Sequence, residues 1–152
     1  MNGAKSMEYK TSAVKTSHEL LQPQEIEVFY IIPTLRNQLA IAMKEQGLKQ
    51  KQIAVLLGIE PATVSQYLHE KRGNKIEFSK EIIDEIKISA FKIKDRLSLL
   101  KEMQRLLRIM RTTREICKLH KQLSNIPGEC TPESIECFGG DFDGPNTRIC
   151  SR

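Results

Sequence analysis

Five side chains in the last third of the chain are of types that bind soft metal ions. Cys117 and His120 lie three residues apart in a predicted helix, so both can face one ligand. Cys130 and Cys137 follow in a loop, and Cys150 lies near the end. A Cys-x-x-His pair with two later cysteines can close a tetrahedral zinc site, and four cysteines can hold an iron–sulfur cluster. The tail lacks a tight Cys-x-x-Cys pair, so free cysteines are the alternative interpretation.

A second group of chemically capable residues follows a tight turn in the middle of the chain. Two apolar-periodic segments, 49–57 and 61–70, are joined at Gly58. Ala54 supplies a small residue where two crossing helices would touch, and Gly58 supplies the backbone freedom of a short turn. Val64 and Tyr67 would then pack the second helix on the first. These residue types at these offsets are typical of a helix-turn-helix motif.

The opposite face of the second segment has the residues that a DNA major groove accepts. Ala62 and the Thr63 methyl can contact a thymine methyl, and Gln66 can form two hydrogen bonds with an adenine edge. Gln50 and Lys51, at the start of the first helix, would meet backbone phosphate. The predicted DNA-binding residues are Gln50, Lys51, Pro61, Ala62, Thr63, Ser65, Gln66, His69, Lys71, Arg72 and Lys75. The alternative is a helical hairpin whose polar residues form a solvated face.

The elements before this motif must position it. Residues 1–24 are polar and aperiodic, which predicts a mostly disordered arm. The stretch EIEVFYII, residues 25–32, is β-branched and aromatic, so it could be a short strand or the lead into a helix. Pro33 suits a first helical turn, and apolar residues then recur at helical spacing up to Gly47.

A helical extension is predicted after the motif, because residues 79–123 contain neither Gly nor Pro. The pattern predicts a long helix broken near Asp95 and a separate short helix over 113–123. Thr112 and Glu115 have the spacing of a capping box before that short helix. Two further surfaces are expected here. The apolar stripe is a candidate dimer seam or part of the chain's own core, and the arginines form a basic ridge that could meet phosphate or water. The stripe is Ile82, Ile86, Ile93, Leu97 and Leu100, and the ridge is Arg105, Arg108, Arg111 and Arg114.

Composition favours a polyanionic partner. The 152 residues include 24 Lys and Arg against 19 Asp and Glu, with a sequence pI of about 9.1. Five acidic and two basic residues fall in 125–152, so the positive excess is concentrated in residues 1–124. No apolar run reaches the length of a membrane span and no secretory signal is recognised, so a cytoplasmic protein is expected. No phosphate loop, metallohydrolase motif or nucleophile elbow is present, and the protein is not expected to be an enzyme.

The residues of the motif carry a family resemblance. The stretch IIPTLRNQLAIAMKEQGLKQKQIAVLLGIEPATVSQYLHEKRG resembles the helix-turn-helix domain of a family of archaeal predicted transcriptional regulators, related broadly to the Cro/repressor type. The carrying motifs are IPTLR, with Ile32 where Leu is more usual, and ATVSQYLHEKRG. The similarity covers residues 28–76 well and 115–123 more loosely. It implies sequence-specific binding to double-stranded DNA and a homodimer.

The sequence thus predicts an all-α protein with a helix-turn-helix DNA-binding domain, a C-terminal helical extension and a Cys-containing tail. The expected divisions are a disordered arm (1–24), the DNA-binding domain (25–76), the helical extension (77–124) and the acidic Cys-containing tail (125–152). The leading hypothesis is a transcriptional regulator whose recognition helix is 61–70. The rival hypotheses are a metal- or redox-responsive regulator that uses the tail, and a helical protein–protein adaptor without sequence-specific DNA binding.

Overall fold

The computed structural model describes residues 20–69 and 76–137, and all regular secondary structure within them is helical. The predicted all-α class is therefore confirmed for this part of the chain. The elements are α1 (Pro23–Ile26), the π-helical turn η2 (Glu27–Ile31), α2 (Ile32–Glu45), α3 (Gln50–Leu57), α4 (Pro61–Leu68), α5 (Lys80–Lys92), α6 (Arg96–Thr112), α7 (Glu115–Leu123) and α8 (Pro132–Ile135). Most of the predicted N-terminal arm, and also Lys71, Arg72, Lys75 and Cys150, lie outside the described residues.

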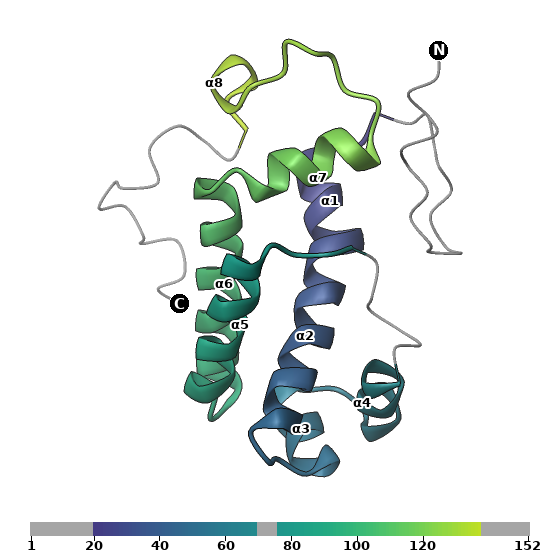
Figure 1. Cartoon of the computed structure of the whole chain (residues 1–152), viewed down its shortest axis with the longest axis vertical. Coiled ribbons are helices and arrows are strands. Elements are labelled where there is room, and N and C mark those ends of the chain that lie inside the picture. Colours follow the sequence, from purple (N-terminus) through teal and green to yellow (C-terminus); the bar gives the residue numbers. More distant parts are fainter. Residues whose placement is uncertain (1–19, 70–75, 138–152) are drawn as a thin grey trace, which may run out of the picture.

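A single helical rod, formed by α1, η2 and α2, runs along the length of the molecule (Figure 1). The strand alternative for residues 25–32 is wrong, since these residues form α1, η2 and the start of α2. The wide π turn directly precedes Pro33, which lacks an N–H and cannot continue the regular helical hydrogen-bond ladder. The rod begins at Pro23, two residues before the boundary placed from sequence.

The other helices pack around this rod. α5 and α6 form a hairpin along one side of α2, while α3 and α4 lie at one end of the molecule (Figure 1). α7 crosses α1 at the opposite end, and α8 lies beyond it. The α3–α4 segment, which the sequence predicts to bind DNA, and the cysteine-containing segment from α7 onward therefore lie at opposite ends of the described residues.

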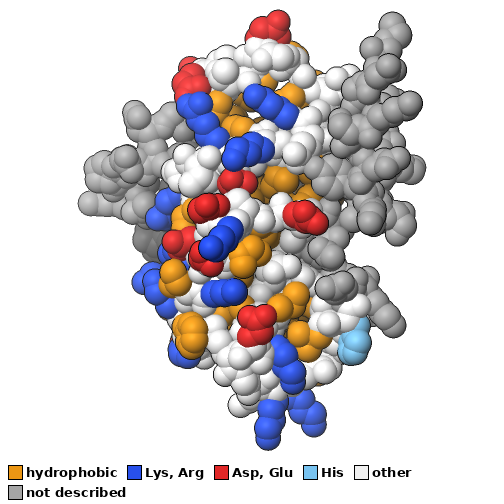
Figure 2. Space-filling view, viewed as in Figure 1, with side chains coloured by type: hydrophobic (Ala, Val, Ile, Leu, Met, Phe, Trp, Pro, Cys, Tyr) orange, Lys and Arg blue, Asp and Glu red, His pale blue; other side chains and the backbone are white. Residues whose placement is uncertain are grey.

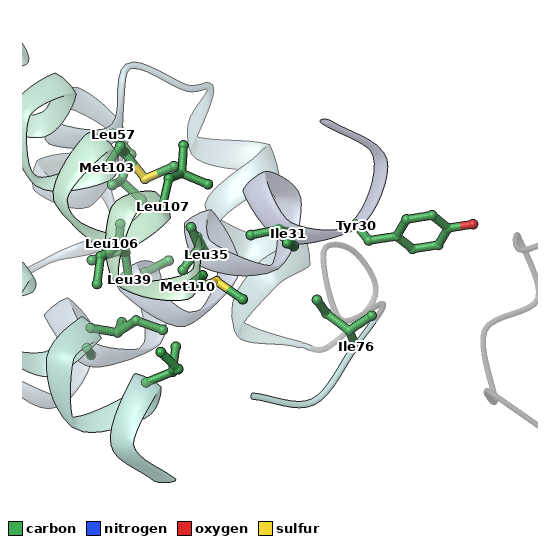
Figure 3. Close-up of a cluster of buried hydrophobic side chains, with 14 of the residues drawn as sticks. Tyr30, Ile31, Leu35, Leu39, Leu57, Ile76, Met103, Leu106, Leu107 and Met110 are labelled. Carbon is green, nitrogen blue, oxygen red and sulfur yellow. The ribbon is translucent and has the colours of Figure 1, made fainter. Parts of the chain in front are cut away.

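One hydrophobic core joins the predicted DNA-binding segment to the predicted extension. Figure 3 shows Leu35 and Leu39 of α2 lying among Leu106 and Met110 of α6, and all four are buried. Because both segments contribute to the same cluster, the boundary at residue 76 does not divide the core. Burial of these side chains supplies the main stabilising free energy, at about 1.5–3 kcal/mol for each large aliphatic residue.

The predicted dimer seam is divided between core and surface. Ile82, Ile86 and Ile93 are fully buried in the chain's own core, so these three are not available to a second subunit. Leu97 and Leu100 are 77% and 63% exposed on α6. The stripe spans both helices of the hairpin, and only its first part faces α2.

The break near Asp95 is confirmed, because α5 ends at Lys92 and α6 begins at Arg96. Asp95 caps α6, with its Oδ1 accepting from the Ser98 backbone N–H at 2.7 Å. This hydrogen bond, and a second from the Ser98 hydroxyl, lower the pKa of the Asp95 carboxyl below its ordinary value.

The predicted capping box at Thr112 and Glu115 is wrong. Thr112 is the last residue of α6, where its hydroxyl donates to the backbone carbonyls of Arg108 and Ile109. Arg114, with a φ of 61°, makes the reversal before α7 instead. Because the Thr112 hydroxyl bonds to carbonyls of its own helix, α6, it does not cap the start of α7.

Three of the four ridge arginines form ion pairs with carboxylates of the chain itself. Arg111 binds Glu27 through two hydrogen bonds of 2.7 and 2.8 Å, which join α6 to η2. Arg105 pairs with Glu85 and Glu102, and Arg114 with Glu133. Arg114 lies outside α6, so the four arginines do not share one helix, and the sequence spacing did not indicate their carboxylate partners.

Glu102 is buried within one of these networks. Its Oε2 accepts from the Ser89 hydroxyl at 2.7 Å and from the Arg105 guanidinium at 2.8 Å. Burial acts to raise the pKa of Glu102, but the hydrogen bonds from Arg105 and Ser89 outweigh it and hold the pKa below its ordinary value. The network fixes α5 against α6.

Candidate functional site

The connection between α3 and α4 is a tight turn at Gly58. This glycine adopts a left-handed backbone conformation with a φ of 63°, which residues other than glycine rarely adopt. The Gly58 N–H donates to the Val55 carbonyl at 3.2 Å, and the Ile59 N–H donates to the Ala54 carbonyl at 3.0 Å. This pair of bonds ends α3 in the Schellman manner and directs the chain into α4 two residues later.

The inward face of this helix pair matches the sequence prediction. Ala54, Val64 and Tyr67 are buried, and α4 packs on both α2 and α3. Asn37, buried in α2, donates a side-chain hydrogen bond of 3.1 Å to the Tyr67 carbonyl near the end of α4. The central rod thus fixes the C-terminal end of the short α4 helix.

The outward face contains the predicted DNA-binding side chains that the structure describes. The exposed ones are Lys51, Pro61, Ala62, Gln66 and His69, and the half-buried ones are Gln50, Thr63 and Ser65. All but Gln50 and Lys51 project from α4 or its C-cap. The small side chains Ala62 and Thr63 lie in the first turn of α4, where a helix most closely approaches a groove.

Gln50 has a positioning contact that the sequence did not reveal. Its side-chain amide donates to the Pro61 carbonyl at 2.8 Å, so the first residues of α3 and α4 are joined directly. This contact aligns the N-terminal ends of both helices on one surface. Lys51 lies beside Gln50 and is exposed, so a cationic group accompanies these two helix ends.

His69 closes the other end of α4. Its Nδ1 lies 2.7 Å from the Ser65 carbonyl, and since a carbonyl only accepts, the ring nitrogen is the donor. The ring therefore satisfies a terminal carbonyl of the helix while its other edge stays exposed to solvent.

Cationic side chains gather at this end of the molecule. Figure 2 shows Lys and Arg side chains projecting at the lower end of the surface, where Figure 1 places α3. Lys49 and Lys51 are exposed at the start of α3, and Glu60 is an exposed carboxylate before α4. The local charge favours a polyanion, although Glu60 reduces it.

At the opposite end, the structure brings the four predicted metal ligands to one cavity. The cavity measures about 20 Å³, which is room for one water-sized group. Its walls come from α7, the loop that follows, and α8. The lining residues are Pro23, Ile116, Cys117, His120, Lys121, Ile126, Cys130, Thr131, Pro132, Ile135 and Cys137. Most of the wall is apolar, and the thiols and the imidazole are its main soft donor groups.

His120 is held in place by the N-terminal segment. It is only 6% exposed, and its Nε2 donates to the Leu21 carbonyl at 2.6 Å. The Leu21 N–H donates in turn to the Ser124 hydroxyl at 2.7 Å. These two bonds join α7 to the start of the rod across about a hundred residues of sequence. No local feature of the sequence indicates these two bonds.

The three described thiols are unpaired and partly buried. Burial raises the pKa of Cys117, although Arg114 opposes this shift. Burial also raises the pKa of Cys137, and the neighbouring Cys117 and Cys130 add to the rise. Among the described residues, no three His, Cys, Asp or Glu side chains are already arranged as a metal site. The cavity therefore collects the donors without placing them in coordination geometry.

Comparison with known proteins gives no test of the resemblance to archaeal regulators, which therefore stays a prediction. No family model matches the chain, and neither the curated proteins nor the solved structures give a significant match. Within residues 20–69 and 76–137, no helix is both long and apolar enough to cross a membrane.

Proposed function

We propose that this protein is a sequence-specific DNA-binding regulator, located in the cytoplasm, whose α4 helix enters the major groove. The observation that carries the proposal is the two-sided character of α4. Val64 and Tyr67 fix one side in the core, while Ala62, Thr63 and Gln66 occupy the outward side. The protein would act by binding and carry no catalytic activity of its own.

Several contacts support a reading role for this helix. The turn at Gly58 and the Gln50–Pro61 hydrogen bond bring two helix N-terminal ends to one surface. Backbone N–H groups at such ends favour phosphate, which positions a protein on the duplex. Gln66, one turn further along α4, would then read a base edge. The sequence resemblance of residues 28–76 to archaeal regulators agrees with this arrangement.

The test is binding of the full chain to DNA selected from a random library, followed by titration against the selected site. A specific regulator will enrich a defined site and bind it in preference to scrambled DNA. Gln66→Ala is expected to reduce discrimination at one base pair by about 1–3 kcal/mol, the usual value of a bidentate base contact. Unchanged site preference in this variant would contradict the assignment of the reading face.

Lys51→Ala provides the matched control for sequence-independent contacts. It should weaken binding to selected and scrambled DNA equally, because phosphate carries no sequence information. The slope of log K against log salt should fall in magnitude by about 0.9 for each lost phosphate contact. A Lys51 variant that altered site preference would reverse the roles assigned to the two residues.

A homodimer is the second part of the proposal, since one helix-turn-helix unit contacts little DNA and such units commonly bind two-fold sites. Leu97 and Leu100 are the parts of the predicted seam that remain on the surface, and Phe91 on α5 is also exposed. Leu97→Glu combined with Leu100→Glu should convert a dimer to a monomer in sedimentation equilibrium. Val28→Glu, another exposed apolar position, is the control that should leave the dimer intact.

The same exposed apolar residues give the adaptor hypothesis its support. An adaptor would use Phe91, Leu97 and Leu100 to bind another protein. It would bind DNA weakly and enrich no site in the selection experiment. Selection of a defined site, together with a dimer that requires Leu97 and Leu100, would favour the regulator over the adaptor.

A further inference from the structure

We propose that Cys117, His120, Cys130 and Cys137 bind one zinc ion between α7 and residues 130–137. The proposal is independent of DNA binding. It rests on the common cavity, on the way His120 is held, and on the charges around the cavity.

The first step is the placement of the donors. Cys117 and His120 are one turn apart on α7, and both line the cavity. Cys130 follows a backbone turn in which its N–H donates to the Pro127 carbonyl at 3.1 Å. Cys137 follows the single turn of α8 and lines the same cavity. Four residues separated by up to twenty positions thus line one cavity, and their three thiols and one imidazole are a ligand set typical of structural zinc.

The second step is the orientation of His120. Its Nε2 is the donor to the Leu21 carbonyl, so in the neutral ring Nδ1 carries the lone pair. Within the described residues, His120 makes no hydrogen bond other than this one through its side chain. Metal-binding histidines are commonly held in this way, with the second ring nitrogen donating to a backbone carbonyl that fixes tautomer and orientation. His120 is 94% buried and its Nε2 is held by the Leu21 carbonyl, so the lone pair of its Nδ1 is available to bind a metal ion.

The third step is charge and the donor set. Zinc with three thiolates and a neutral imidazole has one net negative charge, and Lys121 lines the cavity. Arg114 is a second cation nearby, and its ion pair with Glu133 of α8 offsets part of that charge. An iron–sulfur cluster takes four cysteine ligands in most proteins, whereas three thiols and one imidazole line this cavity. The donor set therefore favours zinc over a cluster.

Zinc binding would complete the coordination geometry by closing a short segment onto α7. The four side chains are not in that geometry within the described residues, so Cys130 and Cys137 must move toward α7. They lie on a loop and on the residue after a one-turn helix, which have few core contacts. Metal binding commonly assembles such a segment, and the ion would then fix the loop after α7.

The experiment is a cobalt titration of the reduced full chain without oxygen, followed by displacement with zinc. Cobalt in a tetrahedral thiolate site gives an intense near-ultraviolet band and visible bands, which zinc removes. One equivalent per chain is expected. Cys130→Ser and Cys137→Ser should each weaken cobalt binding by at least about tenfold, and His120→Gln should shift the visible bands. Cys150→Ser is the matched control and should leave stoichiometry and spectrum unchanged.

Two results would overturn the proposal. The first is the absence of thiolate bands in a chain with normal helical circular dichroism. The second is binding that requires Cys150 and not Cys130 or Cys137. Because Cys130 and Cys137 lie outside the core cluster, their serine variants are expected to fold and to keep the test decisive.

Discussion

At the end of the molecule formed by α3 and α4, the polar side chains point outward, whereas at the end formed by α7 and α8 the thiols line an internal cavity. The first end is fixed mainly by contacts made within a short stretch of chain, including the turn at Gly58, and by the Asn37–Tyr67 hydrogen bond from α2. The second end depends on Leu21 meeting His120 and Ser124 from far away in sequence. Local helix geometry is therefore enough to determine most of an outward-facing surface, whereas a cavity forms only where segments distant in sequence meet.

The largest expected effect tests whether α4 owes its position to the core. Tyr67→Ala should lower the free energy of unfolding by about 3–5 kcal/mol, because it removes a buried aromatic ring beneath α4. Urea denaturation measures this change. Gln66→Ala, the adjacent residue on the outward face, should change stability by less than about 0.5 kcal/mol. Equal losses in the two variants would mean that α4 does not have distinct inward and outward sides.

Glu102→Gln tests a network that belongs to neither end. The variant should lose about 2–3 kcal/mol at neutral pH, since it weakens charge-assisted hydrogen bonds with Arg105 and Ser89. The folded-state pKa lies below the ordinary value of 4.5, so the stabilisation is present above about pH 4.5. It is lost as the pH falls below that value through the folded-state pKa.

The measurement is the urea midpoint of the wild type and of Glu102→Gln between pH 7 and pH 3. The two curves should converge on the acid side, because protonation removes the same charge that the substitution removes. A constant difference across this range would show that Glu102 does not titrate with folding.

Gly58→Ala tests the local turn at the outward end. No atom lies within 4 Å of the added Cβ, so the cost comes from the left-handed backbone and not from a clash. A loss of about 1 kcal/mol is expected, after the smaller unfolded-state entropy of alanine is taken into account. Gly128→Ala, which also meets no atom within 4 Å, is the control near the thiol end and should not destabilise the protein.

The smallest effect is expected for Cys130→Ser in metal-free protein, because this side chain is partly exposed and lies outside the core cluster. The change in unfolding free energy should be below about 0.5 kcal/mol. The same variant should lose the stabilisation that added zinc gives to the wild type. Thermal melts with and without one equivalent of zinc make the comparison, and equal zinc-induced shifts in both proteins would exclude Cys130 from the site.

Sequence patterns predicted the local features of this fold well. Ala54, Gly58, Val64 and Tyr67 lie within fourteen residues of one another, so helix spacing alone places them relative to the turn. The break at Asp95 was likewise predictable, since a capping side chain acts within its own first turn.

The features that sequence missed depend on partners far along the chain. Arg111 was read as part of a surface ridge because nothing near it in sequence indicates that Glu27 lies opposite. Residues 25–32 have the β-branched and aromatic character of a strand, but they form a helical rod whose Ile26, Tyr30 and Ile31 are buried in the core. For the thiol cavity, the sequence indicated the four side chains that line it and missed the two hydrogen bonds at Leu21.

The two hydrogen bonds of Leu21, with His120 and Ser124, limit how this chain can be shortened. These bonds connect residues 103 and 99 positions apart, so the first and last long helical segments of the described body hold each other. A fragment that stops before α7 leaves the start of the rod without its acceptor and donor, and a fragment that begins after Leu21 does the same to α7. The described helices are therefore expected to fold as one unit, and the α3–α4 helix pair is not a removable module.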